Sequence, residues 1–96
     1  MRLTPNEIIQ IKRYTEEVFG IKSRVYLFGS RADDAKKGGD IDLFIEPEQI
    51  TNAFEQEIQF LTKLKFALGD QKIDVIIAKD SDRLIEQEAR RTGVLL

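Results

Sequence analysis

The stretch Leu27-Phe28-Gly29-Ser30, followed by Gly39-Asp40-Ile41-Asp42-Leu43, decides the fold of this chain. The Gly-Ser pair ends one apolar run, and Asp40 and Asp42 open another. Because a strand turns alternate side chains to one face, these two carboxylates point the same way, about 6–7 Å apart. Two such carboxylates repel, which raises the pKa of one unless a cation lies between them. Mg²⁺ is a suitable cation because it prefers oxygen ligands together with a substrate phosphate. With the Gly-Ser turn as a phosphate cradle, the stretch predicts a site for a metal-bound nucleoside triphosphate.

The composition describes one compact domain over residues 1–96 with a modest core. Hydrophobic residues make up 42% of the chain and charged residues 33%, as in a globular domain too short to bury much surface. The sequence has no cysteine and no histidine. A disulfide scaffold, a Cys or His zinc site and an imidazole-based triad are therefore excluded. Catalysis would depend on carboxylates, hydroxyls, basic side chains and a metal.

The charge balance limits the expected partners. A net charge of −2 argues against strong nucleic-acid or membrane-surface affinity. No apolar run is long enough to span a membrane, and the N-terminus lacks a signal-peptide core, so we expect a cytoplasmic protein. Five basic residues near the Gly-Ser pair form either a solvated loop or a basic rim that attracts a triphosphate: Lys22, Arg24, Arg31, Lys36 and Lys37.

Hydrophobic periodicity and capping residues predict the element order α-β-turn-β-α-β-α. We expect an α+β fold in which a small mixed β-sheet packs with about four helices. This sheet has three main strands. The first strand is antiparallel to the second, and the second is parallel to the third. The apolar tail Val94-Leu95-Leu96 either packs on the core or contacts a partner. Helices are expected from the cap Thr4 to Gly20, for one turn from Ser30, from Thr51 or Asn52 to Leu68, and from the cap Asp80 or Ser81 to about Arg91; strands are expected at 24–28, 40–46 and 72–78.

Asp74 is a third candidate carboxylate. It is the third residue of the strand 72–78, as Asp42 is of the strand 40–46, so parallel strands in register would bring the two level on one face. The strand is apolar enough to be central, where a buried carboxylate is costly without a partner. Asp74 is then a metal ligand or the base that takes a proton from an attacking hydroxyl. The alternative is a surface aspartate on an edge strand.

Three carboxylates beside a phosphate cradle fit two-metal phosphoryl or nucleotidyl transfer. In this scheme Asp40 and Asp42 hold two Mg²⁺ ions, and Asp74 holds the ion nearer the nucleophile. Backbone N–H groups at Gly29-Ser30, with the start of a short helix, grip the terminal phosphates. Arg31, which follows the Gly-Ser pair, is a third candidate for binding the nucleotide.

These residues resemble a known family. Leu27-Phe28-Gly29-Ser30-Arg31-Ala32, Gly39-Asp40-Ile41-Asp42-Leu43 and Lys72-Ile73-Asp74-Val75-Ile76 are similar to the motifs of the DNA polymerase β-like nucleotidyltransferases, and of the minimal nucleotidyltransferases (MNT domains) in particular. The resemblance covers residues 24–78. The interval between Ser30 and Asp40 is one residue shorter than the commonest spacing. Asp33-Asp34 stands where the family often has Arg-Gly.

The resemblance implies a nucleotidyltransferase fold, Mg²⁺, and transfer of a nucleoside monophosphate, AMP from ATP, to a hydroxyl. It assigns the carboxylate roles to Asp40, Asp42 and Asp74, and phosphate binding to Gly29 and Ser30. Many minimal members are antitoxins that adenylylate a separately encoded helical HEPN ribonuclease. It therefore implies a HEPN-type protein as partner and acceptor, in a homo- or hetero-oligomer.

Other functions use some of the same residues. A non-catalytic nucleotide-binding module could neutralise or assist a partner by binding alone, and a substrate-delivery subunit would leave catalysis elsewhere. Neither needs three carboxylates. A small Mg²⁺-dependent nuclease would use similar acids but leaves the Gly-Ser turn without a role. The sequence leaves the acceptor and the preferred base open.

Overall fold

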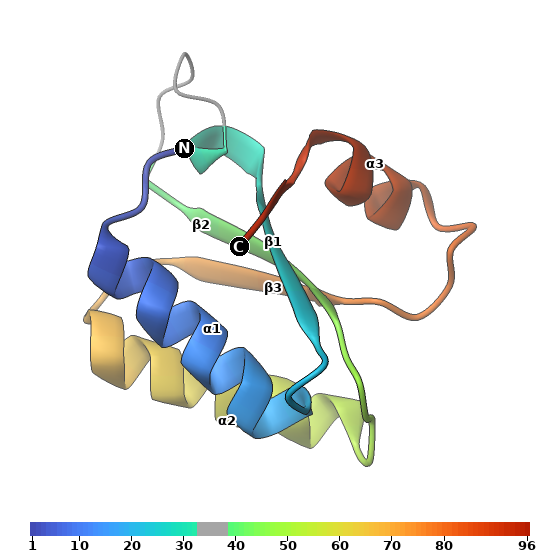
Figure 1. The fold of residues 1–96 in the computed structure, drawn as a ribbon, viewed down its shortest axis with the longest axis horizontal. Coiled ribbons are helices and arrows are strands. Elements are labelled where there is room, and N and C mark those ends of the chain that lie inside the picture. Colours follow the sequence, from blue (N-terminus) through green and yellow to red (C-terminus); the bar gives the residue numbers. More distant parts are fainter. Residues whose placement is uncertain (33–38) are drawn as a thin grey trace.

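The computed structural model describes residues 1–32 and 39–96. Helices and strands alternate along the chain in the expected order, with a short strand added at the end (Figure 1). The elements are α1 (Pro5–Phe19), β1 (Arg24–Phe28), the 3₁₀ turn η1 (Gly29–Arg31), β2 (Ile41–Glu46), α2 (Ala53–Leu68), β3 (Ile73–Ile77), α3 (Leu84–Thr92) and β4 (Val94–Leu95).

The strands form one mixed sheet in the order β3-β2-β1-β4. β1 pairs with β2 antiparallel, as the short connection between them predicts. β2 pairs with β3 in parallel, and α2 forms the crossover between them. Both predicted pairings are therefore confirmed, and with them the α+β class. β3 lies at the edge of the sheet, however, so the expectation of a central third strand is wrong.

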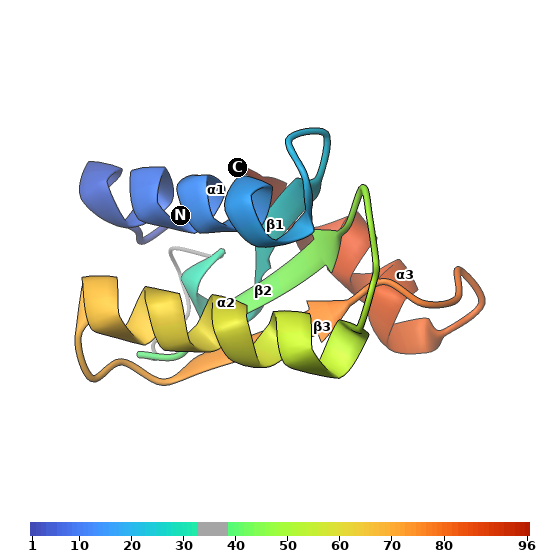
Figure 2. The same cartoon turned by 90° about the horizontal axis from the view of Figure 1, so that it is seen from below.

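The helices cover the two faces of the sheet unequally. α1 and α2 lie side by side on one face (Figures 1 and 2), and the apolar core lies between them and the sheet. α3 packs on the other face, where the guanidinium of Arg90 lies 4.9 Å from the ring centre of Phe44. The buried core consists of Ile11, Phe19, Val25, Leu27, Ile41, Leu43, Ile45, Phe60, Leu64, Ile73 and Ile77.

Capping residues explain where the first two long helices begin. The Thr4 hydroxyl accepts a hydrogen bond from the backbone of Glu7 at 3.1 Å, and the Glu7 carboxylate accepts one from the backbone of Thr4 at 2.8 Å. Pro5 lies within this capping box, at the first helical position, where its missing N–H costs nothing. The side chain of Asn52 caps α2 by accepting a hydrogen bond from the backbone of Glu55 at 3.1 Å. Both predicted helix starts are confirmed.

The last helix begins later than expected, with its N-cap at Arg83. The side chain of Asp80 does not cap it, because its Oδ1 accepts from the backbone of Asp82 at 2.9 Å in a local turn. Glu86 reaches back from α3 and accepts from the backbone of Lys79 and Asp80 at 2.9 and 3.0 Å. These hydrogen bonds keep residues 79 and 80, which connect β3 to α3, outside the helix.

The apolar tail forms β4, which the sequence did not predict as a strand. Leu95 pairs with Tyr26, and Val94 with Leu27. Leu96 packs against the core, which confirms the first of the two alternatives for the tail. In the described part of the chain, no helix has the length and apolar character that crossing a membrane requires.

Candidate active site

Gly29 brings the end of β1 into contact with Asp42. Phe28 pairs with Asp42 across the ladder, so the chain turns beside this carboxylate at the next residue. Gly29 has a φ of +71°, in the left-handed region that favours glycine, and a Cβ there would lie 2.3 Å from Oδ2 of Asp42. Both facts make any other residue strained at this position. The predicted proximity of the Gly-Ser turn and the second strand is confirmed.

The Gly-Ser pair opens the 3₁₀ turn η1. A hydrogen bond of 3.2 Å from the backbone of Ala32 to the carbonyl of Gly29 closes this turn. The backbone of Ser30 therefore lies within a fixed turn at the end of β1. Phosphate binding by Gly29 and Ser30 stays a prediction.

Asp42 and Asp74 lie directly opposite each other on the parallel strands β2 and β3. Asp42 is half-buried, whereas Asp74 is exposed. Burial raises the pKa of Asp42, and the charges of Asp74 and Asp40 and a hydrogen bond to Asp74 raise it further, against a smaller opposite effect of Lys72. The carboxylates therefore carry more negative charge than the neighbouring cation neutralises.

Asp40 forms an ion pair with Lys72, a residue that the sequence reasoning did not select. The Lys72 Nζ lies 3.6 Å from Oδ2 of Asp40; the lysine side chain is largely exposed and the aspartate side chain about half exposed. The backbone of Ile41 also donates to the carbonyl of Lys72 at 2.9 Å. Register could have revealed this pair, because Lys72 precedes Asp74 by two residues as Asp40 precedes Asp42.

The carboxylates fit a hard divalent cation chemically, although they are not yet arranged around one. Among the residues that the structure describes, no three acidic side chains are grouped closely enough to hold a metal ion. Asp40 is turned toward Lys72 instead. An exposed ion pair of this kind contributes at most about 1 kcal/mol, so a cation could displace the ammonium at little cost. Asp42 and Asp74 offer adjacent oxygen donors with unneutralised charge, as Mg²⁺ requires.

Arg31 points into the protein and makes several contacts there. Its guanidinium donates to the carbonyls of Arg2 at 3.2 Å and Gly39 at 3.0 Å, and to the side chain of Gln71 at 3.1 Å. It also lies 3.7 Å from the carboxylate of Glu7, and 17% of its side chain is exposed. Its predicted contact with a nucleotide stays a prediction, because the described contacts are all within the protein.

Of the two alternatives for the basic residues near the Gly-Ser pair, a rim around the turn does not include Lys22 and Arg24. Lys22 and Arg24 lie at the beginning of β1, at the opposite end of the strand from Gly29. The backbone of Lys22 donates to Glu48 there, at 3.0 Å. For these two residues the alternative of a basic rim is therefore excluded, because the length of β1 separates them from the turn. Lys36 and Lys37 lie outside the described residues.

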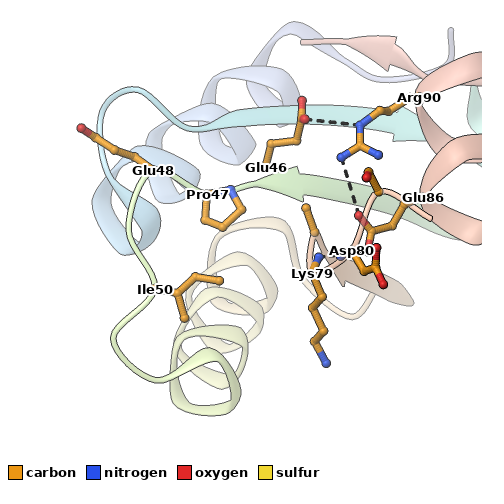
Figure 3. A pocket seen from close by; sticks show the side chains of 10 residues that line it. Glu46, Pro47, Glu48, Ile50, Lys79, Asp80, Glu86 and Arg90 are labelled. Atoms are coloured by element: carbon orange, nitrogen blue, oxygen red, sulfur yellow. Dashed lines mark hydrogen bonds and ion pairs between the residues drawn. The ribbon is translucent and has the colours of Figure 1, made fainter. Parts of the chain in front are cut away.

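A cavity of about 400 Å³ lies at the other end of β2 and β3, where both strands finish (Figure 3). Arg90 reaches between two carboxylates there, with its Nε 3.3 Å from Glu46 and its Nη2 3.6 Å from Glu86. Glu86 is fully buried. The three candidate carboxylates do not line this cavity. Arg90 thereby pairs with a carboxylate of β2 and with one of its own helix, and so attaches α3 to the sheet.

The comparison with known families agrees with this geometry. Residues 9–96 match the family described as Polymerase beta, Nucleotidyltransferase. The match extends beyond the motif region 24–78 to α1 from residue 9 onward, to α3 and to β4. Among curated proteins, none matches the chain.

Proposed function

The chain belongs to the polymerase beta-like nucleotidyltransferase family, and from this premise we propose that it transfers AMP from ATP to a hydroxyl of a partner protein. One arrangement carries the proposal. Asp42 and Asp74 lie level on parallel strands, and Gly29 packs against the first of them. This arrangement supports phosphate binding by the turn that begins at Gly29, next to two carboxylates with unneutralised charge.

The two carboxylates face different neighbours, which supports different roles. Asp42 lies on an inner strand beside the Gly29 turn, so we assign it to the triphosphate side. Asp74 is exposed on the edge strand β3, where a large acceptor could approach, so we assign it to the hydroxyl side. Two Mg²⁺ ions held by these residues and Asp40 would neutralise the triphosphate and lower the pKa of the incoming hydroxyl.

The proposed reaction is an in-line displacement at phosphorus. The acceptor oxygen forms a bond to the α-phosphorus, and the bond from the α-phosphorus to the oxygen that bridges to the β-phosphorus breaks. Pyrophosphate leaves with the electron pair of that bond. The hydroxyl proton passes to the carboxylate of Asp74. Positioning and charge neutralisation supply most of the rate in such reactions.

The proposal also names the molecule that accepts the AMP. We infer a hydroxyl, that of a tyrosine, on a helical HEPN-type protein encoded beside this chain, for which the present protein is the antitoxin. The support is the resemblance to minimal nucleotidyltransferases at residues 27–32, 39–43 and 72–76. The net charge of −2 gives no reason to expect a polyanionic acceptor such as RNA.

Co-expression with the product of the neighbouring gene tests this proposal. Intact mass measurement should show the partner heavier by one or more AMP units, and unmodified with an Asp42→Asn/Asp74→Asn variant. A partner that binds but never gains mass with any nucleoside triphosphate would replace the enzyme with a steric neutraliser. Label from ATP on RNA instead would replace the protein acceptor.

A further inference from the structure

The three segments that carry the candidate site meet at one guanidinium, that of Arg31. Arg31 itself ends the η1 turn that begins with Gly29. Its Nη2 donates to the carbonyl of Gly39, the residue before Asp40, at 3.0 Å. The same nitrogen donates to Oε1 of Gln71 at 3.1 Å, three residues before Asp74. One side chain therefore joins the phosphate turn to the beginning of each carboxylate strand.

The first turn of α1 supplies the opposite charge to this junction. Oε2 of Glu7 lies 3.7 Å from the guanidinium and accepts from Nε2 of Gln71 at 3.0 Å. Burial raises the pKa of Glu7, but hydrogen bonds from Thr4 and Gln71 and the charge of Arg31 outweigh this and lower it overall. Glu7 is therefore ionised at neutral pH, and it holds Arg31 and Gln71 together.

The guanidinium geometry suits this junction better than a nucleotide contact. Arg31 donates along several directions at once, which an ammonium on a flexible stem cannot do. Its contacts reach three separate parts of the chain: residue 2, residue 39 and residue 71. To bind a phosphate, the side chain would have to release these bonds and leave a largely buried position.

We propose that Arg31 is a positioning residue, which fixes the Gly29 turn relative to Asp40 and Asp74 without contacting the nucleotide. This inference rests on the proposed nucleotidyl transfer for its kinetic part. Small displacements of reacting groups cost large factors in rate. Loosening the junction should therefore slow the chemical step more than it weakens the binding of ATP.

Two variants loosen the junction from opposite sides. Arg31→Lys keeps the charge but loses the fork, and Gln71→Ala removes a partner that lies on another segment. Each should lower kcat by about 10-fold or more, with the KM for ATP changed by less than about threefold. The double variant should be little worse than the poorer single one, because both act through one junction. Arg91→Lys and Gln59→Ala, both at exposed positions, are matched controls that should leave kcat unchanged.

Hydrogen exchange tests the junction without any activity. Three backbone amides at the junction should exchange faster in both variants: those of Arg2, Ala32 and Ile41, which donate to the carbonyls of residues 31, 29 and 72. Amides of the β1–β2 ladder should keep their protection, which shows that the variants fold. Unchanged exchange at the junction in both variants would overturn the proposal even if the wild-type protein transfers nothing.

The kinetic result can also overturn the proposal. If Arg31→Lys raises the KM for ATP at unchanged kcat while Gln71→Ala behaves as wild type, Arg31 contacts the nucleotide directly. If the wild-type protein transfers AMP to no acceptor, the proposed function is contradicted. If the junction amides nevertheless exchange faster in both variants, the positioning role of Arg31 is still supported.

Discussion

Asp40 and Lys72 form an ion pair at the beginning of the two parallel strands, with 3.6 Å between Oδ2 and Nζ. The register that aligns Asp42 with Asp74 also aligns these two residues. Lys72 is thus a cation beside three carboxylates, and it lowers the pKa of Asp42 against the effect of the other two. A metal ion at this site would compete with it.

Removing that ammonium should strengthen divalent cation binding. We expect Lys72→Gln to lower the Kd for Mg²⁺ or Mn²⁺ by up to about fivefold, because an exposed ion pair contributes at most about 1 kcal/mol. Calorimetric titration with each metal measures the change. Lys65→Gln, at an exposed position on α2, is the control. Weaker metal binding in Lys72→Gln would show that the lysine supports the site instead of competing for it.

A methyl group at position 29 should damage both fold and site. Gly29→Ala puts a side chain in the left-handed region and a Cβ 2.3 Å from Asp42, so we expect a loss of about 1–3 kcal/mol in unfolding free energy. Chemical denaturation measures it. Gly39→Ala is a matched control, because a Cβ there meets nothing within 4 Å. Equal stability of the two variants would contradict the tight fit between turn and carboxylate.

Local sequence patterns were sufficient to predict the sheet pairing and the level placement of Asp42 and Asp74. Both follow from strand period and from the length of the connections between the strands, which can be seen in the sequence. Gly29 was predictable for the same reason, since it follows directly from the end of β1.

Other features depend on contacts that span the chain. Glu86 and Asp80 satisfy backbone groups that a helix cap would otherwise use, and this moves the start of α3. The partners of Arg31 are residues 2, 7, 39 and 71, so no local spacing could show that its side chain points inward. β4 is only two residues long and gives no periodic signal.

Acid should destabilise the protein partly through Glu86. Burial raises the pKa of this carboxylate, but backbone hydrogen bonds from Lys79 and Asp80 and the charges of Arg83 and Arg90 lower it overall. The unfolded chain then binds the proton more readily, so the stabilisation is complete above the unfolded pKa, near 4.3, and is lost as pH falls through the lower folded value.

Glu86→Gln tests this dependence. At neutral pH it should lower the unfolding free energy by about 1–3 kcal/mol, because the ion pairs with Arg83 and Arg90 are lost. The difference from wild type should shrink below about pH 4, when the wild-type carboxylate is protonated too. Denaturant unfolding across this range measures it. The control Glu88→Gln, at an exposed carboxylate, should change the unfolding free energy little at every pH. If Glu86→Gln lowered the unfolding free energy by the same large amount at every pH, the ionised form of Glu86 would not be the stabilising one.

Asp74→Asn should abolish AMP transfer while leaving the affinity for ATP within about threefold of wild type. Asp74 lies on the exposed edge strand, whereas Asp42 lies beside the turn assigned to the triphosphate. A change on the acceptor side should therefore appear in the rate of the chemical step and not in nucleotide binding. Single-turnover transfer assays and calorimetry with Mg²⁺ and ATP separate the two. Asp42→Asn is the comparison, because it should weaken ATP binding as well as transfer. Near-wild-type turnover by Asp74→Asn would reduce this residue to a surface aspartate on an edge strand.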